Sequence, residues 1–117
     1  MSIEAALYAV LNAQCPRVFP DVAPVATTLP YVVWQMVGGP SPVYTENTLP
    51  NQAAAFVQIT VWDQSRLGAN ALSRQIEAAL MAATTMQARP LSALMAAFDD
   101  GNELRGSMQD FEIWAPR

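Results

Sequence analysis

The sequence predicts an α+β fold, in which an antiparallel sheet of about four to five strands carries two helices on one face. Two apolar segments, 31–37 and 55–62, have the length and composition of long strands. Segments with helical spacing open the chain and follow the second strand directly. Two further strands close the chain, so the helices have one sheet to cover.

Residues 2–14 are expected to form the first helix. Ser2 is the candidate N-cap, Glu4 lies favourably in the first turn, and Pro16 ends the segment. The apolar side chains recur at helical spacing and form one stripe: Ile3, Leu7, Val10 and Leu11. Residues 17–19 then suggest a short edge strand, which a polar, proline-containing connection separates from the next element.

The strand at 31–37 is apolar on both faces, and only Gln35 interrupts the pattern. Such a strand is either central in its sheet or has one face against a partner chain. A loop rich in Gly, Pro, Ser, Thr and Asn follows at 38–53, and it contains the apolar residues Val43, Tyr44 and Leu49. A loop of this length is either a loose hairpin connection or an arm that a neighbouring subunit orders.

The segment 56–83 joins a strand to an amphipathic helix. Val57, Ile59 and Val61 face one side of the strand, whereas Gln58, Thr60 and Trp62 face the other. The helix stripe that should cover the first set is Ala69, Leu72, Ile76, Ala79, Leu80 and Ala83. The side chain of Asp63 or Ser65 is the expected helix cap.

The segment 91–98 has apolar residues that would suit a helix, but the sequence around it favours a closing hairpin. An Asp-Gly turn follows at Asp100-Gly101, and alternation continues from Phe111 to Trp114. We therefore expect residues 92–98 to pair antiparallel with residues 104–114.

The composition predicts a single domain, residues 1–117, with apolar surface to spare. Apolar residues make up 52% of the chain and charged residues only 14%, so a small domain has few charges with which to cover its surface. Exposed apolar surface usually marks an interface, and we expect the protein to form oligomers. The net charge of −4 and the absence of lysine argue against specific nucleic-acid binding. No secretory signal or membrane-spanning run is visible, and Cys15, the only cysteine, fits a reducing cytoplasm.

The chain lacks the usual catalytic side chains. It has no histidine, no lysine and one cysteine, which excludes a Ser-His-Asp triad, a Schiff-base lysine and a zinc cluster. The acids Asp99, Asp100 and Glu103 cluster, but they lie in a turn where carboxylates accept backbone hydrogen bonds and meet water. The sequence therefore predicts a protein that is not an enzyme, with no cofactor and no metal.

Three side chains near the strand–helix unit are candidate interface residues. Trp62 points away from the core stripe, and tryptophan is common in interface hot spots. Arg66 and Arg74 lie on or near the helix face away from Ile76 and Leu80. They are either solvated or paired with acids in the C-terminal hairpin of another subunit.

Taken together, the segments of the chain resemble the tail completion proteins of long-tailed bacteriophages and prophages, a group related to the tail terminators. The similar segments are SIEAALYAVLNA with PRVFPDVAP, LPYVVWQMVGG, FVQITVWDQSRLGANALSRQIEAAL and DFEIW. Their order and spacing carry the match over most of the chain. The long loop at 38–53 and the alanine-rich segment 91–97 depart from the family pattern.

The resemblance implies a structural role in the virion. Proteins of this group form rings, typically hexameric, that cap the head-proximal end of the tail tube, stop its polymerisation and meet the head connector. The implied partners are further copies of the chain, the tail tube protein and the head connector protein. The implied location is the host cytoplasm during assembly and then the virion tail. The acids Asp99, Asp100 and Glu103 would line the ring lumen or an outer solvated edge.

Two alternative functions stay open at this point. A head-closure or head–tail connector protein would also be small, acidic and oligomeric. A small-molecule-binding or regulatory α+β module would need a pocket with convergent polar groups, and the candidates in the sequence are scattered.

Overall fold

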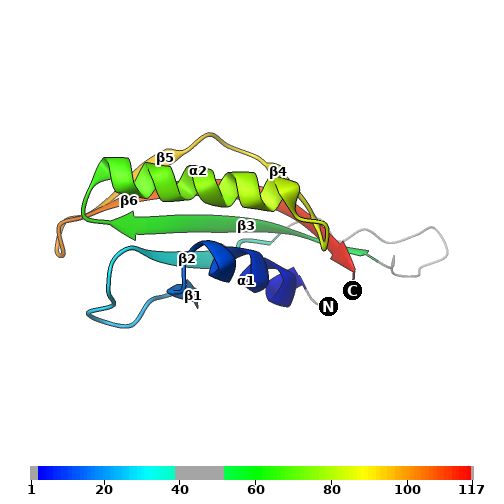
Figure 1. Ribbon diagram of the computed structural model, residues 1–117, viewed down its shortest axis with the longest axis horizontal. Coiled ribbons are helices and arrows are strands. Elements are labelled where there is room, and N and C mark those ends of the chain that lie inside the picture. Colours follow the sequence, from blue (N-terminus) through cyan, green and yellow to red (C-terminus); the bar gives the residue numbers. More distant parts are fainter. Residues whose placement is uncertain (1–2, 39–51, 117) are drawn as a thin grey trace.

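The computed structural model describes residues 3–38 and 52–116, and Figure 1 shows two helices lying on one face of a sheet. The elements are α1 (Ile3–Gln14), β1 (Val18–Pro20), β2 (Tyr31–Met36), β3 (Gln52–Asp63), α2 (Arg66–Ala82), β4 (Gln87–Pro90), β5 (Met95–Asp99) and β6 (Leu104–Pro116). The expected α+β fold is confirmed. The sheet formed by the described residues has six strands rather than four to five, because the edge beside β6 is built from two short strands instead of one.

The strand order is β1-β2-β3-β6-β4, and β5 also pairs with β6. All pairs are antiparallel except β1 with β2, which are parallel. The expected closing hairpin is confirmed, although its first strand begins at Met95 rather than at residue 92. The sequence did not predict β4, which has four residues and ends in proline. Its pairing with β6 continues into the backbone bond from Leu91 N to Asp110 O, at 2.8 Å.

The loop expected at 38–53 is shorter at both ends. Gly38 O still accepts a hydrogen bond from Phe56 N at 2.7 Å, and β3 already begins at Gln52. These residues belong to the strand ladder because their backbone groups have partners there. Residues 39–51, including the candidate interface residues Val43, Tyr44 and Leu49, lie outside the described part of the chain.

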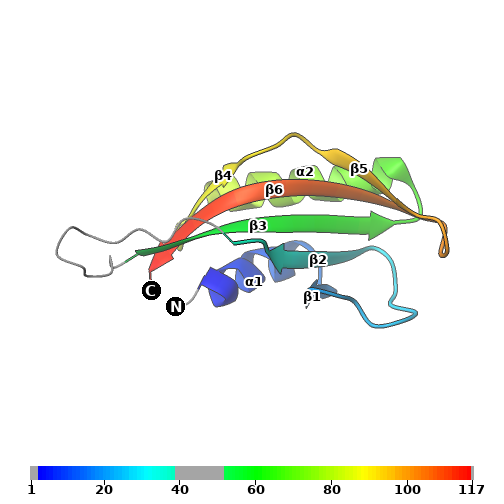
Figure 2. The same ribbon diagram turned by 180° about the vertical axis from the view of Figure 1, so that it is seen from behind.

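The core lies between the sheet and the helices. Val57, Ile59 and Val61 are buried beneath the helices, as the alternation predicts, and the core face of β6 adds Phe111 and Ile113. The largest helix side chains that close this layer are Leu7, Leu11, Ile76 and Leu80. Figure 2 shows the opposite face of the sheet, which neither helix covers. We call this side of the sheet the open face.

The turn between β3 and α2 confirms one of the two expected caps. Ser65 is the N-cap of α2, and its Oγ accepts a hydrogen bond from Gly68 N at 3.0 Å. The cap fixes where the helix begins and therefore which of its residues face the sheet. Across 3–38 and 52–116, neither helix has the length and hydropathy that crossing a membrane requires.

Candidate functional site

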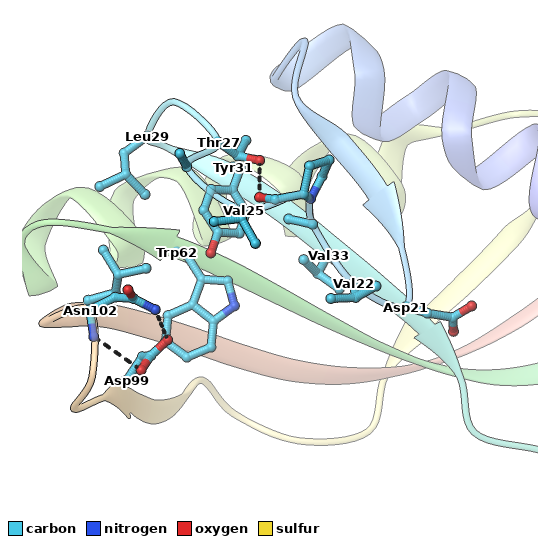
Figure 3. Close-up of a pocket in the computed structure, with 14 residues that line it drawn as sticks. Asp21, Val22, Val25, Thr27, Leu29, Tyr31, Val33, Trp62, Asp99 and Asn102 are labelled. Carbon is cyan, nitrogen blue, oxygen red and sulfur yellow. Dashed lines mark hydrogen bonds between the residues drawn. The ribbon is translucent and has the colours of Figure 1, made fainter.

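A groove lies on the open face, at the end of the sheet where β2 begins and β3 ends. One wall is the connection between β1 and β2, and the other is the turn between β5 and β6 (Figure 3). Its volume is about 440 Å³. The residues that line it are Asp21, Val22, Ala23, Pro24, Val25, Ala26, Thr27, Leu29, Tyr31, Val33, Trp62, Asp99, Asn102 and Leu104. We refer to this set as the groove.

The floor of the groove is built around Trp62. Trp62 lies opposite Tyr31 on β2 and opposite Gly106 on β6. A methyl group at Gly106 would lie 2.8 Å from Cζ3 of Trp62 and 3.1 Å from Cβ of Ala97. The indole therefore lies against a glycine that leaves room for it. This contact keeps Trp62 half-buried within its own chain, with the rest of its surface facing the groove.

The first wall presents apolar side chains to solvent. Val22 is 75% exposed and Val25 is 99% exposed. The wall has two residues with positive φ, Asp21 at 65° and Ala26 at 62°, and Thr27 Oγ1 donates a hydrogen bond to Pro24 O. Periodicity did not indicate this wall because it belongs to neither a helix nor a strand.

The second wall carries the acidic turn. Oδ1 of Asp99 accepts hydrogen bonds from Gly101 N at 3.1 Å and from Asn102 N at 3.4 Å, and its Oδ2 accepts one from the Asn102 amide at 2.9 Å. Asp99 is half-buried at the groove, whereas Asp100 and Glu103 are exposed in the turn beyond it. The turn thus uses Asp99 to fix its own backbone, as expected for an acid at this position.

The charge of Asp99 acts on the floor of the groove. Burial of the Tyr31 hydroxyl and, to a smaller extent, the negative charge of Asp99 raise the pKa of Tyr31 above its ordinary value of 10.0. Tyr31 lies on β2 at the floor of the groove and Asp99 lies on the second wall, yet the carboxylate is near enough to affect the phenol. Most residues that line the groove are apolar, and its charged side chains, Asp21 and Asp99, are both negative.

The second candidate surface is the face of α2 that points away from the sheet. Its exposed residues are Leu67, Ala71, Arg74, Gln75, Ala78, Met81 and Ala82, and we call this set the outer α2 face. Only Arg74 and Gln75 are polar. Leu67 is 84% exposed and Met81 is 56% exposed. Among the described residues, Arg74 has no carboxylate within 4.0 Å. The outer α2 face could have been found in the sequence, because its apolar residues form a second stripe at helical spacing, on the side opposite Ile76 and Leu80.

Arg66 does not lie free in solvent, as the sequence suggested it might. Its guanidinium donates hydrogen bonds to Gly106 O and to Ala97 O, the latter at 3.1 Å. The side chain therefore ties the first turn of α2 to both β5 and β6. A sequence pattern does not show such a bond, because the acceptors are backbone carbonyls far along the chain. Its candidate role at an interface stays a prediction.

Among residues 3–38 and 52–116, no three acidic or cysteine side chains are arranged so that they could hold a metal ion. The surfaces of interest are thus two contact surfaces, the groove and the outer α2 face. They lie on opposite sides of the sheet: α2 lies on the side that Val61 faces (Figure 1), whereas Trp62, at the floor of the groove, faces the other side.

Comparisons with known proteins agree with this picture. Among solved structures, a chain of the "Virion of native gene transfer agent (GTA) particle" superposes with a TM-score of 0.60 at 18% identity, over 99% of this chain and 96% of that chain. At this identity the likeness shows the fold. Comparison with curated proteins finds no match. A family model described as "Tail completion protein gp17" matches residues 2–115. The chain therefore belongs to the tail completion protein gp17 family and is a structural protein of a phage tail.

Proposed function

We propose that this protein caps the head-proximal end of a phage tail tube as a ring of identical subunits. The cap would end polymerisation of the tube and offer a surface to the head connector. Family membership supports a role in tail completion, and the fold similarity to a chain of a gene transfer agent virion is consistent with it. The ring is taken to be hexameric, as in the group that the sequence resembles.

The main observation that supports a ring is the exposed apolar surface of the outer α2 face. A surface helix normally turns polar residues to water, yet five of the seven exposed residues here are apolar. Leu67 and Met81 lie at the two ends of this face with Ala71 and Ala78 between them, and an apolar surface of this kind can mark a contact with a partner. The low charged fraction of the chain, 14%, points the same way. The candidate interface residues Val43, Tyr44, Leu49, Trp62, Arg66 and Arg74 stay predictions within this proposal.

The acidic turn has a defined part in the proposed ring. Asp99, Asp100 and Glu103 lie together at one end of the sheet, and no basic side chain forms an ion pair with them among the described residues. Asp99 is half-buried at the groove and holds the turn, so the exposed acids are Asp100 and Glu103. In a ring lumen these two charges would repel DNA phosphates and keep the passage free. On the outer edge they would be solvated. Charge neutralisation of Asp100 and Glu103 distinguishes the two placements, because only in the lumen would it change DNA passage in assembled particles.

The remaining parts of the proposal follow from the structural role. The protein acts without catalysis and without a cofactor, and residues 1–117 act as one domain. It binds further copies of itself, the tail tube protein and the head connector protein, but neither specific DNA sequences nor membranes. Assembly takes place in the host cytoplasm, and the protein then stays in the virion tail.

The direct test measures the mass of the protein alone and with purified tail tubes, by size-exclusion chromatography with light scattering and by sedimentation. The proposal expects a ring-sized species, or a monomer that becomes a stoichiometric cap on tubes and stops their elongation. Emptied heads are the matched control. Binding to heads but not to tubes would instead identify a head-closure or head–tail connector protein.

The groove favours one candidate function of another class. Its volume of about 440 Å³ lies in the range of small-molecule sites. Its polar groups are largely engaged already, because Asp99 and Asn102 bind one another. A small-molecule-binding or regulatory module would show a ligand-dependent rise of several degrees in melting temperature across a metabolite panel. A flat panel with tube binding intact eliminates this alternative.

A further inference from the structure

We infer that the subunits of the proposed ring join head to tail, with the outer α2 face of one copy seated on the groove of the next. The inference rests on the proposed ring and adds the two surfaces that make it. Each copy would then use both surfaces once. The placement of the two surfaces, their shapes and their charges support this pairing.

The placement fits a closed ring. The two surfaces lie on opposite sides of the sheet, because Val61 faces the helices and its neighbour Trp62, in the groove, faces the other way. One copy therefore cannot bring them together. A contact between two different surfaces is heterologous, and it generates a ring when the rotation between neighbours closes. A contact that used one surface twice would stop at a dimer.

The shapes are complementary. Ala71 and Ala78 occupy the middle of the outer α2 face, and their small side chains allow close approach of the helix backbone. The groove supplies a concave apolar surface in which Val22 and Val25 are largely exposed. Seating the helix there covers the exposed apolar side chains of both surfaces at once, which is the main source of stability in such contacts.

The charges are also complementary. Arg74 is the only charged residue of the outer α2 face, and no carboxylate pairs with it among the described residues. The groove carries Asp21 and Asp99 and no basic residue. Burial and, to a smaller extent, the nearby charge of Asp99 raise the pKa of Tyr31 at the floor of the groove, which is consistent with a negative groove. An arginine brought to this surface would gain attraction that it lacks in the single chain.

The main alternative, a two-fold pairing of α2 with α2, is unfavourable for a specific reason. Arg74 is the middle residue of α2, which runs from Arg66 to Ala82. Two antiparallel copies of the helix related by an axis through their centres would set Arg74 against Arg74. Like charges opposite one another destabilise such a contact, and the groove would stay empty.

Disulfide trapping tests the pairing of the two surfaces. Ala71→Cys places a thiol on the outer α2 face, and Val25→Cys places one on the exposed groove wall. The native Cys15 is only 2% exposed and stays out of reach. Under mild oxidation of assembled material, a chain with both substitutions should give a ladder of dimer, trimer and larger bands. A mixture of the two single variants should give one heterodimer.

The control pairs Val25→Cys with Asn12→Cys, whose position is exposed on α1 outside both surfaces, and it should give no ladder. Dimers from Ala71→Cys alone would show α2–α2 pairing and overturn the inference. Assembled rings or caps without the ladder would also overturn it while leaving the proposed ring intact. If the unaltered protein forms no assembly by itself or on tubes, the proposed function fails as well.

A charge exchange gives a second readout that does not depend on new thiols. Arg74→Glu should weaken assembly about tenfold or more while the urea midpoint of the folded chain stays unchanged. Adding Asp21→Asn, which removes the opposing negative charge with a residue type that tolerates the positive φ of 65° at this position, should restore part of the assembly. Equal weakening in the single and double variants would contradict the pairing of these surfaces.

Discussion

The two faces of α2 differ less in polarity than in what covers them. The inner face buries Ala69, Ser73, Ile76 and Leu80 against the sheet, and it includes a serine. The outer α2 face is mostly alanine, leucine and methionine, yet nothing among the described residues covers it. A surface helix normally turns mostly polar residues to water, whereas only Arg74 and Gln75 are polar among the exposed residues of the outer α2 face. One half of this helix is therefore used for the fold, and in the proposed ring the other half makes a contact with another chain.

The largest expected effect is a loss of stability that differs between two neighbouring residues, Leu80 on the inner face of α2 and Met81 on the outer α2 face. Leu80→Ala removes a fully buried side chain from the core and should lower the free energy of unfolding by about 2–5 kcal/mol. Met81→Ala, one residue further on the outer α2 face, should change it by less than about 0.5 kcal/mol. Urea unfolding followed by circular dichroism measures both values. Equal losses would mean that the outer face also supports the fold of the single chain.

Two arginines on the same helix extend the comparison to charged groups. Arg66→Gln removes the guanidinium that binds two backbone carbonyls and should cost about 1.5–3 kcal/mol. Arg74→Gln should leave the stability of the monomer within about 0.5 kcal/mol, because no partner in the described chain is lost. The same unfolding experiment tests the pair. A stable Arg66→Gln variant would refute the structural role of Arg66.

A third test moves from the helix to the open face of the sheet. Gly106→Ala would push a methyl group against the indole of Trp62 and should cost about 1–3 kcal/mol. Gly101→Ala is the matched control, since its new methyl group would lie no closer than 3.7 Å to Asp99 Oδ1. Tryptophan fluorescence should shift in the first variant and stay unchanged in the second. An unshifted spectrum for Gly106→Ala would show that Trp62 is free to move.

The smallest expected effect concerns pH at the groove. The pKa of Tyr31 is raised in the folded chain, so its contribution to stability is complete below pH 10.0 and is lost as the pH rises through the folded pKa. In a spectrophotometric titration, Tyr31 should ionise at a higher pH than an unperturbed tyrosine, which gives a late component in the curve. Tyr31→Phe should remove that late component, and Asp99→Asn should bring it to lower pH. A titration of the unaltered protein with no late component would contradict this account of the groove.

The sequence predicted the parts of the fold whose information is local. The alternation of Val57, Ile59 and Val61 and the cap at Ser65 located β3 and α2, because each pattern fits within a few residues. The four residues of β4 were missed, since so short a segment with a proline shows no alternation. Its pairing is decided by β6, whose paired residues lie more than twenty positions further along the chain.

The groove could not be predicted from the sequence for the same reason. One wall comes from the connection between β1 and β2, the other from the turn after Asp99, and the floor from Trp62. Only the folded sheet brings these parts together. Trp62 was a candidate interface residue, but its contact with Gly106 depends on register, which periodicity does not give. The bonds of Arg66 depend on carbonyl positions and left no trace in the pattern of side chains.

The position of β6 in the chain sets the order in which the protein can fold during synthesis. β6 pairs with β3, β4 and β5, and it follows all of them in the sequence. Phe111 emerges from the ribosome 54 residues after Val57, its partner in register. Until then one edge of β3 has no partner, and unpaired edges invite association with other chains. A nascent subunit therefore cannot complete its sheet, or present a finished groove, before its last strand has been translated.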